Sequence, residues 1–68
     1  MSYFENAKED EKVICKIYGE GKIIFVCKDM KYALMVSFNS GEEIPYTIDG
    51  IPAIATEEEQ TLFYPDDI

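Results

Sequence analysis

Carboxylates are the main side chains in this 68-residue sequence that could take part in chemistry, since fourteen aspartates and glutamates stand against six lysines. The chain has no histidine and no arginine, and its formal net charge is −8. Without histidine, the hydroxyls of Ser2, Ser37 and Ser40 lack the usual base that activates a nucleophile. Neighbouring carboxylates such as Glu42 and Glu43 point to opposite faces of a strand, so they cannot act together on one substrate. We therefore expect a protein that is not an enzyme.

The carboxylates are concentrated at the two ends of the chain. Residues 1–11 carry four carboxylates and one lysine, residues 12–41 carry five lysines and two carboxylates, and residues 42–68 carry eight carboxylates and no lysine. A protein that binds nucleic acid directly neutralises phosphates with lysine and arginine, so direct binding is not expected. A dense set of carboxylates can instead imitate phosphates and occupy a basic groove. The alternative explanation is that these charges only keep a small domain soluble.

The two cysteines, Cys15 and Cys27, each lie within an apolar run. This pattern favours free thiols in a reducing cytoplasm, with a disulfide left open if the two runs pair as strands. Two cysteines without histidine make no tetrahedral metal set, and no carboxylate spacing matches a calcium loop, so we expect no metal and no cofactor. No apolar run approaches the length of about 20 residues that spans a membrane, and no signal peptide opens the chain.

Short apolar runs separated by turn residues predict five strands, at residues 12–18, 22–27, 32–38, 42–48 and 51–55. Residues 19–21, Gly-Glu-Gly, are expected to form the turn between the first two strands; they lack the glycine spacing of a phosphate-binding loop. Residues 39–41 form a hairpin connection ending in glycine, and residues 49–50, Asp-Gly, predict a type I′ hairpin turn. Pro45 and Pro52 flank that turn and cannot donate to a sheet, which predicts a sheet edge there.

Five strands and no long helical pattern predict an all-β fold, a small SH3-like (Tudor-like) five-stranded barrel. We divide the chain into an acidic N-terminal lead-in at residues 1–11, the barrel at 12–55 and an acidic tail at 56–68 that packs on the barrel. The tail is expected to hold a short helical or 3-10 segment, with Thr56 as its N-cap and Glu59 at the capping-box position. The apolar residues at 62–64 would close one end of the barrel.

The stretch VICKIYGEGKIIFV at residues 13–26 resembles the first hairpin of Tudor-like and SH3-like modules, in which an aromatic-Gly-x-Gly turn joins two strands. MVSF and NSGE at residues 35–42 resemble the third strand of these modules and its glycine turn. Over nearly the whole chain, the order YGEGKI, VSFNSGE, YTIDG and TLFYPDD looks like a group of short phage-encoded proteins. The likeness implies a phage protein that acts in the bacterial host cytoplasm. The chain departs from the pattern at residues 28–32 and 51–52.

These features together predict a non-enzymatic binding protein that modulates or inhibits a host nucleic-acid-handling or defence protein through an acidic surface. The carboxylate clusters are the expected contacts with this partner, together with the tyrosines at strand ends, for which burial with a satisfied hydroxyl is the alternative. They are Tyr18, Glu20, Glu42, Glu43, Tyr46, Asp49, Glu57, Glu58, Glu59, Asp66 and Asp67.

Two alternative functions remain open. An oligomer could hold a nucleotide second messenger in pockets between barrels, with Lys16, Lys22, Lys28 and Lys31 contacting its phosphates. The chain could also be a self-assembling structural accessory protein. Self-association is expected in each case, because a domain of this size has a thin core.

Overall fold

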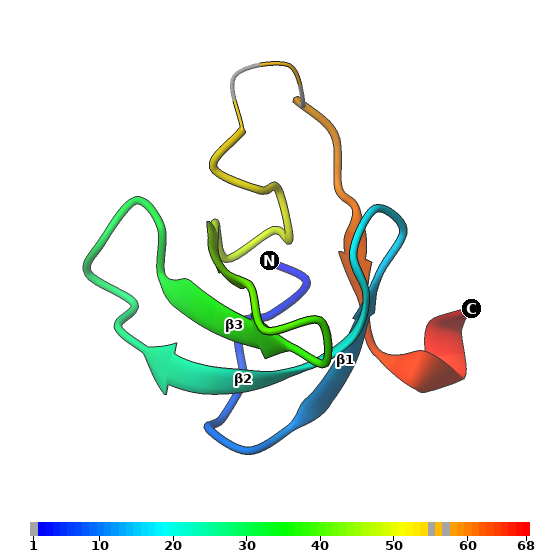
Figure 1. The fold of residues 1–68 in the computed structure, drawn as a ribbon. Coiled ribbons are helices and arrows are strands. Elements are labelled where there is room, and N and C mark those ends of the chain that lie inside the picture. Colours follow the sequence, from blue (N-terminus) through cyan, green and yellow to red (C-terminus); the bar gives the residue numbers. More distant parts are fainter. Residues whose placement is uncertain (1, 55, 57) are drawn as a thin grey trace.

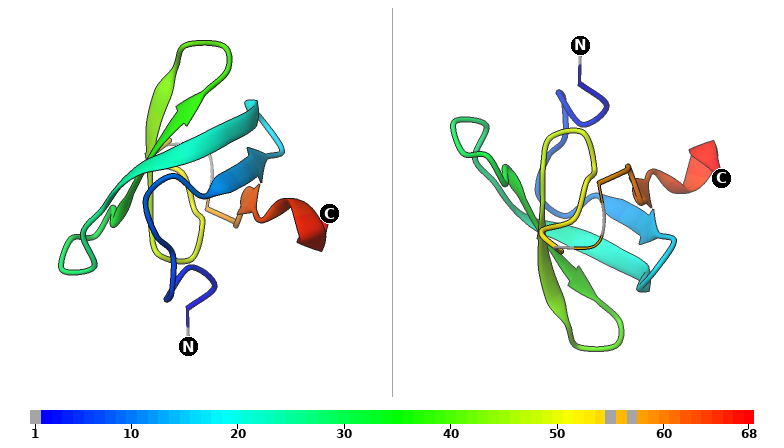
Figure 2. Two further views of the ribbon diagram at one scale, coloured as in Figure 1. Left: turned by 90° about the horizontal axis from the view of Figure 1, so that it is seen from below. Right: turned by 90° about the horizontal axis from the view of Figure 1, so that it is seen from above.

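A computed structural model describes residues 2–54, 56 and 58–68, and within them the fold is nearly all β (Figure 1). Its elements are β1 (Lys12–Cys15), β2 (Gly19–Val26), β3 (Leu34–Phe38), β4 (Glu43–Tyr46), β5 (Leu62–Phe63) and the 3-10 turn η1 (Pro65–Asp67). The strands form one antiparallel sheet in the order β4-β3-β2-β1-β5. The sheet curls into a half-barrel, which confirms the predicted small SH3-like architecture and the predicted 3-10 segment (Figure 2).

The core lies on the inner face of the curled sheet. Alternate residues of β3 are buried, as expected for a strand with one face toward the core. The fully buried side chains are contributed by all five strands and by the N-terminal segment: Phe4, Val13, Cys15, Ile23, Leu34, Val36, Tyr46 and Leu62. Phe4 also bonds through its backbone N–H to the carbonyl of Ile48 at 2.9 Å. The described part of the lead-in, residues 2–11, is therefore part of the folded body.

The turn between the first two strands lies earlier than predicted. Residues 16–18 form it, and the Gly-Glu-Gly stretch begins β2, where Cys15 pairs with Gly19. Gly19 has a positive φ of 86°, which suits the exit from this tight connection. Gly21 is required for a different reason, because a Cβ atom there would lie 2.6 Å from the Phe38 ring. Gly19 thus allows the chain to turn into β2, and Gly21 allows β2 to pack closely against Phe38 of β3.

The Asp-Gly turn is not of type I′. That turn needs positive φ at both central residues, and among the described non-glycine residues only Asp10 has a positive φ. Instead, Gly50 has a φ of 83°, its N–H bonds to Thr47, and the Thr47 N–H bonds to Ile51, each at 2.9 Å. This is a three-residue hairpin loop closed by a glycine bulge. The predicted connection at residues 39–41 is confirmed and has the same pattern, with Gly41 at a φ of 96°.

The predicted fifth strand at residues 51–55 and the tail helix capped by Thr56 are wrong. Pro52 forms only an isolated bridge with Tyr46, and the fifth strand is β5, from the tail that was placed outside the barrel. The described residues at 56 and 58–61 are not helical. Backbone bonds to the body hold the end of this segment extended, because Thr61 both donates to Gly50 at 3.1 Å and accepts from Lys16 at 2.9 Å. The expected sheet edge is confirmed, since β4 with Pro45 is an edge strand.

Candidate functional site

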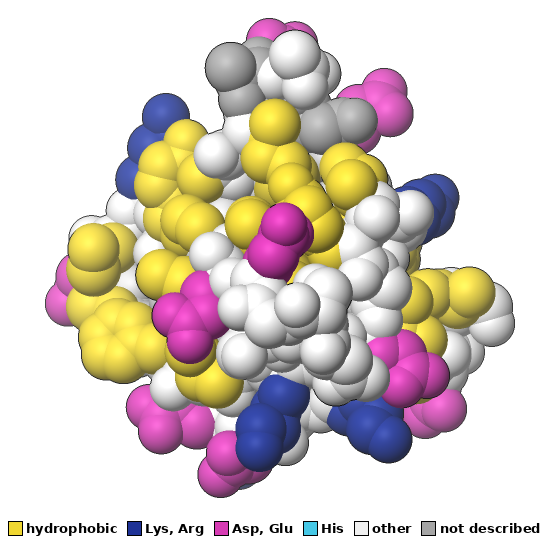
Figure 3. Space-filling view, in the orientation of Figure 1, with side chains coloured by type: hydrophobic (Ala, Val, Ile, Leu, Met, Phe, Trp, Pro, Cys, Tyr) yellow, Lys and Arg dark blue, Asp and Glu magenta, His cyan; other side chains and the backbone are white. Residues whose placement is uncertain are grey.

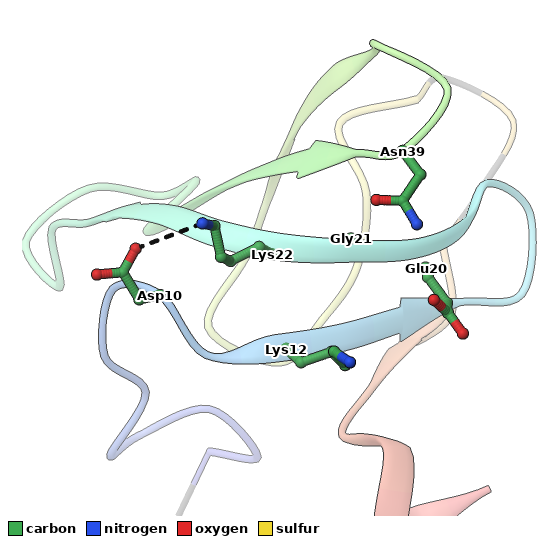
Figure 4. Close-up of a pocket in the computed structure, with 6 residues that line it drawn as sticks. All are labelled: Asp10, Lys12, Glu20, Gly21, Lys22 and Asn39. Atoms are coloured by element: carbon green, nitrogen blue, oxygen red, sulfur yellow. Dashed lines mark ion pairs between the residues drawn. The ribbon is translucent and has the colours of Figure 1, made fainter.

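A shallow groove of about 330 Å³ crosses β1 and β2 and is the first site to consider (Figure 4). Its polar lining comes from the approach to β1, from both strands and from the β3–β4 turn, and consists of Asp10, Lys12, Glu20, Gly21, Lys22 and Asn39. Two lysines and two carboxylates cancel in formal charge. Lys12 and Lys22 are direct cross-strand partners, and Asp10 approaches Lys22 to 3.8 Å.

This groove has the volume of a small ligand site, but its lining contains none of the hydrophobic and aromatic residues that usually predominate at such sites. Its one ion pair is exposed, and exposed pairs contribute little to stability. No lining residue supplies a nucleophile beside a base, since the charged groups are only carboxylates and ammonium groups. Among the described residues, no group of three or more side chains of the metal-binding types lies close enough to hold a metal ion. The groove can therefore meet a mixed-charge surface, and nothing in its geometry points to catalysis.

The predicted contact residues lie in different environments. Tyr46 is fully buried and its hydroxyl is hydrogen-bonded, so it is not a surface contact, and the alternative of a buried tyrosine with a satisfied hydroxyl is confirmed. Tyr18 is half-buried against the Phe38 ring, with the two ring centroids 5.4 Å apart. Glu20 is exposed and lines the groove. Glu57 lies outside the described residues.

Seven of the predicted carboxylates, here called the C-terminal carboxylates, are all exposed: Glu42, Glu43, Asp49, Glu58, Glu59, Asp66 and Asp67. They occupy the β3–β4 turn and start of β4, the next hairpin loop, the approach to β5 and the turn η1. Among the residues that the structure describes, none of them forms a salt bridge. On the face seen in Figure 3, acidic side chains occur at several separate places. The fold thus presents unpaired negative charge around the body and does not gather it into one compact patch.

Tyr46 is buried because it completes a polar cluster inside the core. Its hydroxyl donates to the Cys15 sulfur at 3.0 Å, and the Cys15 thiol donates to the Thr61 hydroxyl at 3.4 Å. Burial, and next the bond to Cys15, raise the pKa of Tyr46 well above its ordinary value. Cys15 and Cys27 are both free. Cys15 pairs with Gly19 at the start of β2 and Cys27 follows Val26 at its end, so the two thiols are too far apart to form a disulfide. Cys15 therefore has a structural role.

The two termini meet through a second group of aromatic residues. Tyr3 packs against Phe4, Phe63 and Tyr64, its hydroxyl donates to Asp67, and it accepts the Tyr64 N–H at 3.0 Å. The Tyr64 hydroxyl donates to Glu11 at 3.0 Å. Burial and this bond to a carboxylate raise the pKa of Tyr64 to about 12. Asp67 is thus tied to the N-terminal segment, while the other C-terminal carboxylates have no such side-chain bond among the described residues.

The lysines proposed to bind a second messenger do not come together in one copy of the chain. Lys16 lies over the Phe63 ring at 4.9 Å from its centroid, and Lys22 lies within β2. Lys28 and Lys31 lie in the β2–β3 connection, where Lys31 sits over the Tyr32 ring. These positions give the nucleotide alternative little support.

Sequence reasoning missed an apolar region on the outer side of the sheet. Hydrophobic side chains gather over the β2–β3 hairpin, on the left of Figure 3. Four large hydrophobic residues are exposed in this part of the chain: Ile24, Phe25, Met30 and Tyr32. A bulge between Ile23 and Phe25 shifts the register, so two consecutive β2 residues become exposed. The run KIIFVC, apolar on both strand faces, was the signal that could have indicated it.

No family model, curated protein or solved structure matches this chain. Among the described residues, no helix is long and apolar enough to cross a membrane. The functional argument therefore rests on the fold, the charges and the surfaces described above.

Proposed function

We propose that this protein is a non-enzymatic binding protein that engages a nucleic-acid-binding protein through its C-terminal carboxylates. The observation that carries the proposal is that all seven are exposed and that none forms a salt bridge among the described residues. Unpaired carboxylates keep their full charge for a partner, and complementary charge speeds encounter and selects against wrong partners. A protein built to bind phosphates offers the basic groove that such charge fits.

The partner class follows from the likeness to short phage-encoded proteins. A phage protein that works inside its host meets the host's nucleic-acid-handling and defence proteins, so we propose one of these as the partner. Binding would block or modulate the partner by occupying a surface that it otherwise uses for nucleic acid. The fold supports this role, because Glu42 and Asp49 lie on short hairpin loops that backbone hydrogen bonds already order, so these loops lose little freedom on binding.

The test is affinity capture from a nuclease-treated bacterial lysate, using the wild type and two variants of equal net charge. The first variant carries Glu42→Gln, Asp49→Asn, Glu58→Gln and Glu59→Gln. The control variant neutralises four exposed carboxylates that are not among the expected contacts, with Glu5→Gln, Glu9→Gln, Asp10→Asn and Asp29→Asn. We expect the wild type and the control to capture the same nucleic-acid-binding protein, and the first variant to lose it. Equal capture by both variants would contradict the proposal.

A further inference from the structure

The outer face of strands β2, β3 and β4 carries an apolar row whose three residues are exposed or half-buried. In the registers, Phe25 pairs with Met35, and Met35 pairs with Pro45. Directly paired residues of antiparallel strands project from the same face, so these three side chains form one row across three strands. Phe25 is 50% exposed, and Met35 and Pro45 are half-buried. Met35 lies between the buried residues Leu34 and Val36, which places the row on the side opposite the core.

A second row, made of polar side chains, lies beside the apolar one. Lys22 pairs with Ser37, and Ser37 pairs with Glu43. Met35 and Ser37 are two residues apart on β3, so both rows share the outer face. The polar row therefore has a lysine at its β2 end and a glutamate at its β4 end, each one strand away from β3. That separation is about 4.8 Å on either side of β3.

We propose that this face, the Phe25–Met35–Pro45 row with Lys22 and Glu43 beside it, is where a second copy of the chain docks. A two-fold axis between the two sheets, running along β3, reverses the order of each row in the second copy. It brings Phe25 over Pro45 of the second copy, and Met35 over Met35. It also places Lys22 opposite Glu43 of the second copy, and Glu43 opposite Lys22. In this arrangement apolar side chains meet apolar side chains and lysine meets glutamate, so the face is complementary to itself, as an isologous interface requires.

The charge of the whole molecule favours this face over others for self-association. Two chains that each carry a net charge of −8 repel one another. The β2–β4 face holds one lysine and one glutamate in its polar row, and Lys28 and Lys31 lie in the adjoining connection. The lysine of each copy lies opposite a glutamate of the other, which reduces the repulsion between two acidic chains at this face. Lys22 is available, because its contact to Asp10 is a 3.8 Å pair between exposed groups, and such pairs contribute little.

The edge of β4, which borders this face, does not offer an equally good route. β4 is an edge strand, but Pro45 has no N–H to donate to a neighbouring chain. The Pro45 carbonyl accepts the Ala53 N–H at 2.9 Å, and Thr47 bonds to Ile51. The free hydrogen-bonding edge of β4 is thus partly occupied by residues 51–53 of the same chain. Packing of sheet faces remains, and two sheets pack well when their strands are nearly aligned.

The experiment is a solution mass measurement by sedimentation equilibrium over a concentration series. We expect the wild type to reach twice the chain mass of 7.8 kDa and to fall toward 7.8 kDa on dilution. Lys22→Glu and Glu43→Lys each place like charges opposite one another in the dimer, so each variant should remain at the mass of one chain. The double variant, K22E with E43K, restores opposite charges and should regain the dimer.

Matched controls separate the interface from general effects of charge and hydrophobicity. Lys8→Glu and Glu5→Lys make the same charge changes in the N-terminal segment, outside the two rows, and should leave the dimer intact. Phe25→Ser should abolish the dimer, while Ile17→Ser, at another exposed apolar residue in the β1–β2 turn, should not. A wild type that stays at 7.8 kDa throughout, an oligomer that survives Phe25→Ser, or a double variant that stays at the mass of one chain would each overturn the proposal.

Discussion

At the scale of single residues, the most informative position is Tyr46, which the sequence places at a strand end and the structure places in the core. Its hydroxyl, the Cys15 sulfur and the Thr61 hydroxyl join β4, β1 and the approach to β5. No unsatisfied buried side-chain nitrogen or oxygen is present among the described residues. The cluster therefore stabilises the core and satisfies the polar group that a buried tyrosine brings with it.

Replacement of Tyr46 by phenylalanine tests this role. The ring still fills the core, but the hydrogen bond to Cys15 is lost, so we expect the free energy of unfolding to fall by about 0.5–1.5 kcal/mol. Tyr46→Ala should cost about 3–5 kcal/mol, because it also leaves a cavity. Urea unfolding followed by circular dichroism measures both. Tyr18→Phe is the control, and a Tyr46→Phe protein as stable as the wild type would contradict the role of the hydroxyl.

The tyrosines also predict how stability depends on alkaline pH. The pKa of Tyr64 is raised to about 12 in the folded protein, and those of Tyr3 and Tyr46 are also raised. The folded state therefore keeps protons that the unfolded state releases above its ordinary tyrosine pKa of about 10. By linkage, these groups contribute their full stabilisation below pH 10, and the contribution is lost as pH rises through their folded pKa values, which for Tyr64 means between about 10 and about 12. Tyr64→Phe should make the fall in the free energy of unfolding shallower. An unchanged pH profile would contradict the assignment.

At the scale of elements, the glycine turns determine the hairpins. Gly41 and Gly50 close the two three-residue loops with positive φ, but their surroundings differ. A Cβ atom at Gly41 would meet nothing within 4 Å, whereas one at Gly50 would lie 2.8 Å from the Leu62 carbonyl oxygen and 2.9 Å from the Phe4 ring. Gly50 is thus the point where the loop, the N-terminal segment and the approach to β5 come together.

This difference gives a paired prediction. Gly41→Ala should cost about 1–2 kcal/mol, which is the cost of the left-handed conformation for a residue with a side chain. Gly50→Ala should cost clearly more, because backbone atoms of the approach to β5 must also move. Thermal unfolding of the two variants measures the difference. Equal losses would show that the contacts at Gly50 do not matter.

The same elements show what the sequence could predict. Alternating apolar residues predicted β3, and the glycine after Asn39 and Ser40 predicted its turn, because both are local signals. The replacement of the strand at 51–55 by β5 was not predictable in this way, since Leu62 and Phe63 become a strand only by pairing with Cys15 and Ile14. The apolar outer row depends on registers and on the bulge at Ile24, which a single sequence does not specify.

At the scale of the whole molecule, the excess of negative charge predicts a response to salt. Among the described residues, Lys22 and Asp10 form the one salt bridge, so most carboxylates are not neutralised within the chain. Repulsion among them opposes the compact state and is screened by added salt. We expect the melting temperature at neutral pH to rise when sodium chloride is added. The variant with Glu42, Asp49, Glu58 and Glu59 neutralised should respond less, and a wild-type melting temperature that falls with salt would contradict this account.

The two proposed surfaces share one residue, Glu43, and can be tested separately. The C-terminal carboxylates meet a basic partner, and the outer face of β2–β4, where Glu43 lies opposite Lys22 of the second copy, meets a second copy of the chain. The excess of carboxylates in the C-terminal part can be read from the sequence. The placement of Lys22 and Glu43 on either side of Ser37 follows only from the strand registers of the sheet. The variant used for partner capture leaves Glu43 unchanged, so loss of the partner with retention of the dimer distinguishes the two.

The most direct measurement of the central claim is competition for the captured partner. The protein is immobilised with its bound partner, and duplex DNA is added at constant salt concentration. We predict that DNA releases the partner in proportion to its concentration, because carboxylates and phosphates compete for one basic groove. A partner that binds DNA and this protein at the same time, without release, would contradict the account.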